Sequence, residues 1–362
     1  MPRLPVFRPL NRNTHGARRV PCRAPFSFAL RAMVAAAAFA LPGTVAAAGD
    51  AEQTAREPAP LETFQRREER LFRVGYRLAT ANAAFCDQAV KVSGLLIHDA
   101  DSYGDPEAVR AQFQLTGDLG VQAVAPGSPA DAIGIGQNDT ILSIDGKSIL
   151  GDWPKTDPRW QRAFAIRDAM DAALALGQLE ISFLPRSGEL QTARIAGVDA
   201  CPTRFELIDS KKSAAADGKR VMVGENFPGF AYDEPSFAAA IAHEMAHNIL
   251  RHPQTFGDIG WKRRLVRLSE RDADRLMPWL LYNAGYDPRA AIAFMRTWGP
   301  RHGGWIFRKR THDGWDERVE FIEAELPKIE RARKLNVDGL ADWKTHFSSD
   351  LEKELARRQA AP

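Results

Sequence analysis

The sequence has only three cysteines in 362 residues, and it contains no Cys-x-x-Cys pair. Zinc ribbons and thioredoxin-type redox sites are built on such pairs, so we expect neither class. Cys22 lies in an N-terminal segment that we expect to be removed, which leaves Cys86 and Cys201. In an oxidising compartment these two residues could form a disulfide, and the alternative is two unrelated small buried side chains.

Acidic residues and lysines are absent from residues 1–48, which carry seven arginines. An apolar run over 32–41 follows the basic part, and Ala46 and Ala48 satisfy the small-residue rule for signal-peptide cleavage before Gly49. We therefore predict that residues 1–48 are a signal peptide that directs the chain across the inner membrane to the periplasm. An arginine-rich, acid-free start also fits a mitochondrial transit peptide, which stays the alternative.

Long apolar runs are missing as well. The run over 32–41 is about half of the ~20 residues that a membrane span needs, and no later stretch is long enough. We expect no transmembrane span in the mature chain, with peripheral membrane contact left open. The net charge of +3 includes the seven arginines of residues 1–48, so the rest of the chain stands at −4. The basic isoelectric point is therefore no sign of a nucleic-acid partner, and we expect none.

Residues 49–86 are predicted to be a linker followed by an amphipathic helix. Residues 49–60 are polar and contain proline, which is typical of a flexible segment. Between 61 and 84, apolar residues recur near helical spacing and charged residues fill most other positions. The apolar positions are Leu61, Phe64, Leu71, Val74 and Leu78.

The stretch VQAVAPGSPADAIGIGQNDTILSIDGKSI (121–149) predicts a strand, a short helix and a second strand. Ser128 can cap the helix, which Pro129 begins, and Asp145-Gly146 is a tight-turn signal. From APGSPA onward this stretch resembles the core of a PDZ domain. The resemblance implies a PDZ-like β-barrel domain over 87–200, with a helix near 158–176 and a strand over 179–186.

PDZ domains bind an extended peptide as an added strand, and a loop holds the peptide carboxylate. Two segments could supply that loop, SGLLIH (93–98) and GDLGV (117–121). We favour the first, because its apolar residues can open a strand, and we take Gly94, Leu95 and Leu96 as the candidate peptide-binding residues. The alternative is a structural spacer that binds no peptide.

Two histidines and a glutamate stand inside the apolar stretch AIAHEMAHNIL. On a helix that starts near Asp233, with Pro235 in its first turn, His243 and His247 lie one turn apart on one face. Both imidazoles can then reach a single zinc ion, and Glu244 lies beside it as a general base. The alternative is a chance pattern on a solvated or buried helix face.

A catalytic zinc site needs a third protein ligand and one open position. The third histidine of the metzincins is lacking, because Leu250 and Pro253 stand where that pattern requires Gly and His. His252 is out of register with the helix face, so we expect it to cap the helix end or to be solvated.

The stretch LSERDADRL offers a better third ligand. Glu270 and Asp274 are four residues apart, so a helix places them on one face, and the small Ala273 lets a second helix approach. We predict that Glu270 binds the metal and that Asp274 accepts the N–H of a ligating imidazole. The alternative is an exposed charge pattern with Arg271 and Arg275.

HExxH followed by Glu-x-x-Ala-Asp resembles the gluzincin metallopeptidases that include the heat-shock protease HtpX and the CAAX prenyl protease. AAADGKRVMV (214–223) resembles the edge strand of that family, and YNAGYDPRAAIAFMR (282–296) resembles the segment after its third ligand. RTHDGWDERV resembles its Thr-His-Pro…Arg motif, with Asp313 in place of the proline. The resemblance implies that His312 stabilises the oxyanion and that Arg318 organises the cleft, although Arg318 could be an ordinary surface arginine.

The resemblance covers roughly 61–335 and implies an α+β chain. A mainly helical zincin-type domain with a small edge sheet is expected over 201–335, beside the PDZ-like domain. Further helices are expected over 264–283, after Pro288 and over 315–333, and residues 336–362 should form a charged, helical tail.

The implied function is that of a zinc-dependent endopeptidase with one Zn²⁺ held by His243, His247 and Glu270. Its partners would be protein or peptide substrates, such as misfolded envelope proteins, that pair with the strand near 214–223. Two alternatives are a non-proteolytic PDZ binding or chaperone-like adaptor protein and a mitochondrial quality-control protease.

Overall fold

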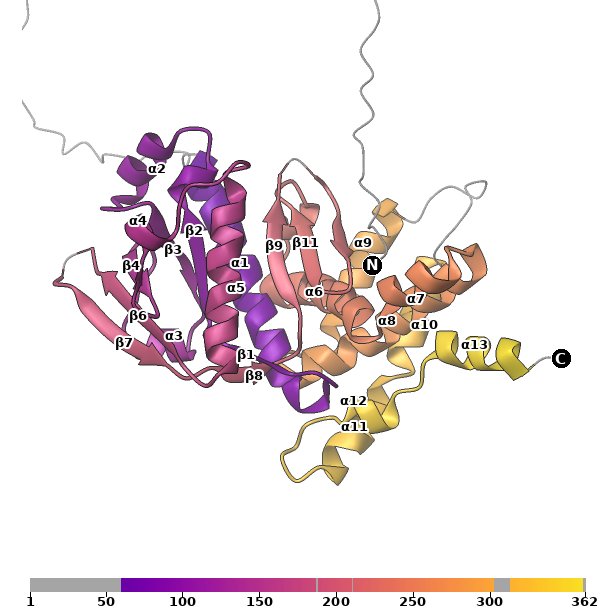
Figure 1. Cartoon of the computed structure of the whole chain (residues 1–362). Coiled ribbons are helices and arrows are strands. Elements are labelled where there is room, and N and C mark those ends of the chain that lie inside the picture. Colours follow the sequence, from indigo (N-terminus) through magenta and orange to yellow (C-terminus); the bar gives the residue numbers. More distant parts are fainter. Residues whose placement is uncertain (1–59, 187, 210, 303–312, 361–362) are drawn as a thin grey trace, which may run out of the picture. The chain divides into compact units, whose positions relative to one another are not determined.

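The computed structural model describes residues 60–186, 188–209, 211–302 and 313–360 (Figure 1). Helices and strands both contribute to it, in agreement with the expected α+β class. The predicted signal peptide over 1–48 and the candidate residue His312 lie outside the described residues. Among the described helices, none combines the length and the apolar character needed to cross a membrane.

An antiparallel sheet occupies most of the segment from 95 to 195. Its strands lie in the order β2 (Leu95–Asp99), β3 (Leu119–Val124), β4 (Thr140–Ile144), β6 (Leu179–Leu184) and β7 (Gln191–Ile195). The short strand β5 (Lys147–Ser148) pairs with β4. The helices of this segment are α2 (Pro106–Phe113), α3 (Pro129–Ala132), α4 (Ile149–Asp152) and α5 (Trp160–Ala175).

The local signals in the stretch 121–149 act as predicted. Ser128 caps α3 by accepting the backbone N–H of Asp131, and Pro129 is the first residue of the helix. Asp145 and Gly146 have φ values of 46° and 72° and form the tight turn between β4 and β5. The expected helix near 158–176 and strand over 179–186 are present as α5 and β6.

The sheet is open, so the expectation of a β-barrel is wrong for the described part of the chain. Strands β2 and β7 lie at its two ends and do not pair with each other. Helix α5 packs against β2 and β6 instead (Figure 1). Ile166 of this helix is buried in one core with Ile141 and Phe183 of the sheet. The helix thus buries the apolar face that a closed barrel would have to enclose.

The two ends of this segment are held together by a strand pair and a disulfide. Strand β1 (Val90–Val92) pairs antiparallel with β8 (Val198–Ala200). Beside them a disulfide joins Cys86 to Cys201, whose Cα atoms lie 5.5 Å apart. The first of the two alternatives for these cysteines therefore applies. The segment has its own hydrophobic core, while its contacts with the rest of the chain make 57–362 one compact unit.

The second group of elements combines a small sheet with helices. The sheet has the order β10 (Ala214–Ala216), β11 (Arg220–Gly224) and β9 (Arg204–Ile208), antiparallel between the first two and parallel between the last two. Strand β10 is therefore an edge strand. The helices are α6 (Glu234–Ile249), α7 (His252–Ile259), α8 (Arg263–Asn283), α9 (Ala290–His302), α10 (Trp315–Glu323) and α11 (Leu326–Leu335). Short 3₁₀ helices are η1 (Ala83–Phe85), η2 (Ala100–Ser102) and η3 (Pro228–Ala231).

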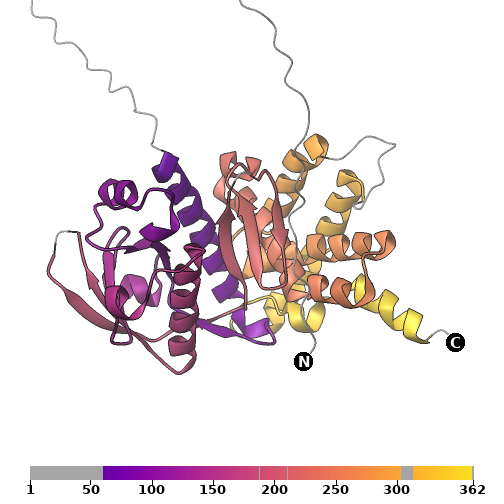
Figure 2. The ribbon, with the colours of Figure 1, turned by 45° about the horizontal axis from the view of Figure 1, so that its top comes forward.

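Helix α1 (Pro60–Ala81) is the predicted amphipathic helix. Leu71, Val74 and Leu78 are buried in the same core as α6 and α8. The helix contacts β3 on one side and β9, α6 and α8 on the other, so it joins the two groups (Figure 2). Gly75 permits this close packing, because a Cβ atom there would overlap the ring of Phe205 in β9.

The helix expected over 315–333 is divided into α10 and α11. Pro327 lies in the first turn of α11. It has no backbone N–H, and in a continuous helix its ring would clash with the carbonyl of Glu323. The chain therefore ends one helix and starts another at this point.

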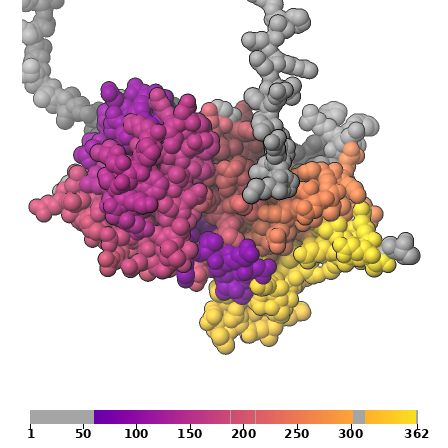
Figure 3. All heavy atoms as spheres, viewed as in Figure 1, coloured from indigo at the N-terminus to yellow at the C-terminus, as the bar shows by residue number. Residues whose placement is uncertain are grey.

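The C-terminal segment 336–362 is more than a charged tail. It forms α12 (Trp343–His346) and α13 (Asp350–Ala360), and Trp343 and Leu351 are buried. Asp272 of α8 accepts the backbone N–H groups of Asp350 and Leu351. In Figure 3 the yellow C-terminal surface lies directly against the orange helices, as this anchoring requires.

Candidate metal centre

Helix α6 carries the two histidines at one side of its C-terminal half. Asp233 caps the helix by accepting the backbone N–H of Ser236, and Pro235 lies in the first turn, where its missing N–H costs little. Most of the helix is buried, including His243, while Glu244 and His247 are partly exposed. The local sequence therefore sets both the helix and the register of its polar residues.

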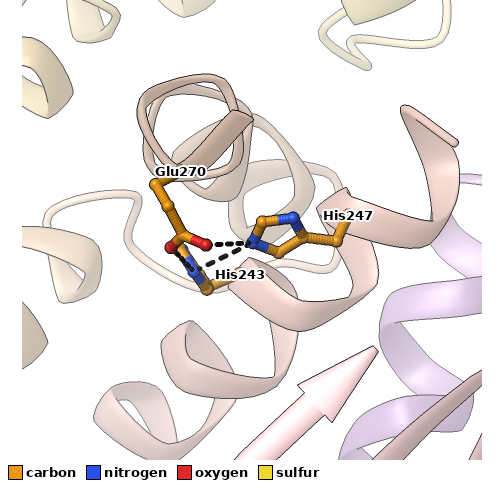
Figure 4. A group of neighbouring side chains, drawn as sticks. All are labelled: His243, His247 and Glu270. Atoms are coloured by element: carbon orange, nitrogen blue, oxygen red, sulfur yellow. Dashed lines mark hydrogen bonds and ion pairs between the residues drawn. The ribbon is translucent and has the colours of Figure 1, made fainter. Parts of the chain in front are cut away.

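Helix α8 brings the third candidate ligand to the histidines. It packs along α6, and Ala273 of α8 is fully buried in the core that the two helices share. Glu270 Oε2 lies 3.5 Å from His243 Nε2, and Glu270 Oε1 lies 3.7 Å from His247 Nε2. The two Nε2 atoms are 3.3 Å apart, and all three side chains point toward one another (Figure 4).

These three side chains could hold a metal ion. Each offers one ligand atom, and the three atoms lie within 4.8 Å of one another. The donor set is two imidazole nitrogens and one carboxylate oxygen, which suits zinc and other late transition metals better than magnesium or calcium. The three side chains, which come from two different helices, therefore fit a bound metal ion of the kind that the sequence predicts.

The residue behind His243 is Asp274, one turn after Glu270 on α8. Its Oδ1 lies 3.1 Å from His243 Nδ1, the ring nitrogen that faces away from Glu270. Arg318 of α10 donates Nε–H and Nη2–H to the two oxygens of this carboxylate, both at 2.6 Å. Only 12% of the Arg318 side chain is exposed, so the alternative of an ordinary surface arginine is wrong.

Charges around His243 alter its protonation. Burial by itself lowers the pKa of His243, but the carboxylates of Asp274 and Glu270 outweigh it and raise the pKa to about 10. Burial raises the pKa of Asp274, and Arg318 and His243 together hold it below its ordinary value. A metal cation bound between these carboxylates would compete with the proton on His243, so acid would weaken its binding.

His252 is placed differently from our expectation. It is 2% exposed, and its Nδ1 lies 2.9 Å from His247 Nδ1. The expectation of a solvated or capping residue is therefore wrong. Arg251 has a left-handed backbone conformation, with φ of 55°, which ends α6 and turns His252 back toward it. The sequence did not predict this contact, because a helical continuation would point His252 away from His247, and a non-glycine residue with positive φ is uncommon.

Asp313 is a second residue whose role the sequence did not reveal. It stands where the family resemblance calls for proline, and it accepts hydrogen bonds of 3.1 and 2.9 Å from Nε and Nη2 of Arg271. Its side chain is nearly buried. The ion pair thus holds Asp313, just before the start of α10, against Arg271, which follows Glu270 on α8.

The edge strand β10 lies next to α6. The turn that joins it to β11 is anchored to the helices, because Gly218 donates its N–H to Asn248 Oδ1 at 2.6 Å and its carbonyl accepts from Gln254. Gly218 has φ of 97°, and a Cβ there would overlap Gln254. The anchored hairpin thus holds β10 beside α6, and no described strand pairs with the outer edge of β10.

The candidate peptide-binding residues Gly94, Leu95 and Leu96 lie at the start of β2. Gly94 has φ of 75°, and β2 is an end strand of its sheet. The competing segment 117–121 enters β3, which pairs on both sides and has no edge to offer. Helix α5 is held along β2 by Arg162, which binds the Asp99 carboxylate. Peptide binding at this strand stays a prediction.

Compared with family models and with curated proteins, the chain shows no significant match. Arguments about its function therefore start from the residues and contacts described above.

Proposed function

We propose that the chain is a zinc-dependent endopeptidase. The observation that carries the proposal is the meeting of His243, His247 and Glu270 from two helices, with Asp274 and Arg318 behind His243. Two histidines and one carboxylate leave a fourth position open, which is the pattern of catalytic rather than structural zinc sites.

Each residue around the site has a role in peptide hydrolysis. When bound, zinc supplies Lewis-acid polarisation of a carbonyl and lowers the pKa of a water. Glu244 follows His243 on α6 and is suited to take the proton from the attacking water and return it to the leaving amine. Asp274 orients His243, and Arg318 keeps Asp274 ionised. His312, outside the described residues, is proposed as a donor to the oxyanion on the family resemblance alone.

The substrate would be an extended segment of a protein. Strand β10 lies next to α6 and pairs on one side only within the described ranges, so a peptide could add to its other edge as a further strand. The segment 87–200 would recruit or gate such substrates, with misfolded envelope proteins as the class suggested by resemblance. The Cys86–Cys201 disulfide supports an oxidising compartment such as the periplasm, which agrees with the predicted signal peptide.

A cleavage assay with matched variants tests the proposal. The full chain, processed by a secreting host, is incubated with unfolded casein, with a chelator, and with zinc after the chelator. We expect cleavage that the chelator stops and zinc restores, and at least about a 100-fold loss in Glu244→Gln. Glu323→Gln on the surface of α10 is the control and should match the wild type.

Three results would overturn the proposal. Equal cleavage by the wild type and Glu244→Gln would show that Glu244 is not the general base. Iron instead of zinc in the purified protein would point to a reaction other than zinc-dependent hydrolysis, because the same donor set also suits Fe(II). An inert wild type that nevertheless binds peptides through β2 would favour the adaptor alternative.

A further inference from the structure

The two histidines of the metal centre are supported from behind by different groups. His243 turns Nε2 toward Glu270 and Nδ1 toward the Asp274 carboxylate. His247 also turns Nε2 toward Glu270, but its Nδ1 faces another imidazole, Nδ1 of His252, at 2.9 Å. A carboxylate supports one ring, and an imidazole supports the other.

A contact of 2.9 Å between two ring nitrogens requires one hydrogen between them. A metal on His247 Nε2 needs the lone pair of that atom, so the ring hydrogen of His247 must be on Nδ1. His252 Nδ1 is then the acceptor, and His252 carries its own hydrogen on Nε2. In the part of the chain that the structure describes, Nε2 of His252 is buried and has no hydrogen-bond partner. The polar contact that His252 makes there is therefore the one to His247.

The surrounding chain holds His252 firmly in this place. Arg251 adopts the left-handed conformation at the end of α6, and His252 is the first residue of α7, followed by Pro253. The imidazole rings of His247 and His252 contact each other with centroids 4.9 Å apart. Arg251, with its strained backbone, and the buried His252 imidazole, whose Nε2 has no hydrogen-bond partner among the described residues, thus stand next to a candidate metal ligand.

We propose that His252 is a positioning residue that holds His247 in its Nδ1-protonated tautomer and thereby presents Nε2 to the metal. This inference rests on the proposed metal function of His247. Partners of this kind typically change metal affinity by about 10- to 100-fold when they are removed. An ordinary core histidine would affect folding but would have no specific effect on the metal.

Zinc affinity of the full chain, measured by competition with a chromophoric chelator, separates these cases. His252→Phe keeps a buried ring and removes the acceptor, and we expect it to weaken zinc binding about 10- to 100-fold. His252→Asn places an oxygen near the former Nδ1 and should recover affinity to within about threefold of the wild type. His98→Phe is the matched control, because His98 is also buried with an unpartnered Nε2 within the described residues, but lies in β2. It should bind zinc like the wild type.

The position of the ring hydrogen on His247 provides a second measurement, which a change in packing alone would not alter. In the zinc-bound wild type labelled with ¹⁵N-histidine, NMR should show the His247 hydrogen on Nδ1, protected from exchange with water. The same signal should persist in His252→Asn and exchange rapidly in His252→Phe. This measurement on the wild type keeps the inference testable even where a variant folds poorly.

Three results would overturn the inference. These are zinc affinity in His252→Phe within about threefold of the wild type, equal weakening in His252→Asn and His252→Phe, or a His247 hydrogen on Nε2 in the zinc complex. If the wild type binds zinc and cleaves casein while His252→Phe behaves identically, this inference fails and the proposed function stands. If the wild type binds no zinc, both fail.

Discussion

Arg318 donates two hydrogen bonds of 2.6 Å to the carboxylate of Asp274, although the two residues are 44 positions apart in the sequence. Asp274 is almost completely buried and in turn faces His243 Nδ1. The ion pair thus connects α10 to the candidate metal centre through one carboxylate. Burying both charges is favourable only because they are paired and hydrogen-bonded to each other.

Replacing Arg318 with lysine should damage this connection. Lysine keeps the positive charge but lacks the planar fork that binds both carboxylate oxygens. We expect Arg318→Lys to lose about 1–3 kcal/mol of folding free energy and about tenfold in zinc affinity. Denaturant unfolding and chelator competition measure the two effects. Arg296→Lys, in an exposed pair with Glu323, is the control, and the idea is wrong if both variants behave alike.

Zinc should stabilise the folded chain, since the ligands come together only in the fold. At a zinc concentration about 100-fold above the dissociation constant, linkage predicts a gain of about 3 kcal/mol in the free energy of unfolding. Glu270→Gln should lose most of this gain, and a thermal shift measures it. Magnesium serves as the control cation, because it prefers oxygen ligands. A shift of the same size in Glu270→Gln would contradict the assignment of the third ligand.

The contact between α1 and β3 should make stability depend on pH. Burial raises the pKa of Glu68 from 4.5 to about 7, although its carboxylate accepts a 2.5 Å hydrogen bond from Gln122. The folded chain therefore keeps a proton that the unfolded chain has lost between these values, so stability falls as pH rises from 4.5 to 7.

Glu68→Gln should remove this dependence. We expect it to be more stable than the wild type by about 1–3 kcal/mol above pH 7, and equally stable below pH 4.5. Urea unfolding at several pH values provides the difference. A constant difference across the whole range would show that the effect comes from packing and not from the proton.

The disulfide should contribute strongly to stability. Cys86 and Cys201 are 115 residues apart, so the bond restricts a long loop of the unfolded chain. Removing it with Cys86→Ala and Cys201→Ala together should lower the free energy of unfolding by about 2–5 kcal/mol. Reductant should destabilise the wild type by a similar amount and leave the double variant unaffected. If reductant changes neither protein, the bond is absent from the folded chain.

Local features were predictable because neighbouring residues cause them. The caps at Ser128 and Asp233 act within one helical turn, and the Asp145-Gly146 turn depends on two adjacent backbone conformations. The same holds for α1, whose apolar spacing alone predicts an amphipathic helix. Glu270 could likewise be selected as a candidate ligand, and the structure places it beside His243 and His247.

The sequence-based predictions that were wrong concern features that depend on contacts between distant segments. A strand pattern does not tell whether β2 and β7 meet, so the barrel was predicted where α5 covers an open sheet. Helical register excluded His252, because one left-handed residue at Arg251 reverses the chain, and that conformation is stable only in its packed surroundings.

The sequence by itself determined the helix that carries His243, Glu244 and His247, because periodicity and capping act over a few residues. Only the tertiary structure decided that Glu270 meets them, that Arg318 is buried on Asp274, and that His252 stands behind His247. The physical reason is that close approach of distant polar groups is set by the packing of α6, α7, α8 and α10 together, which no single stretch of sequence contains.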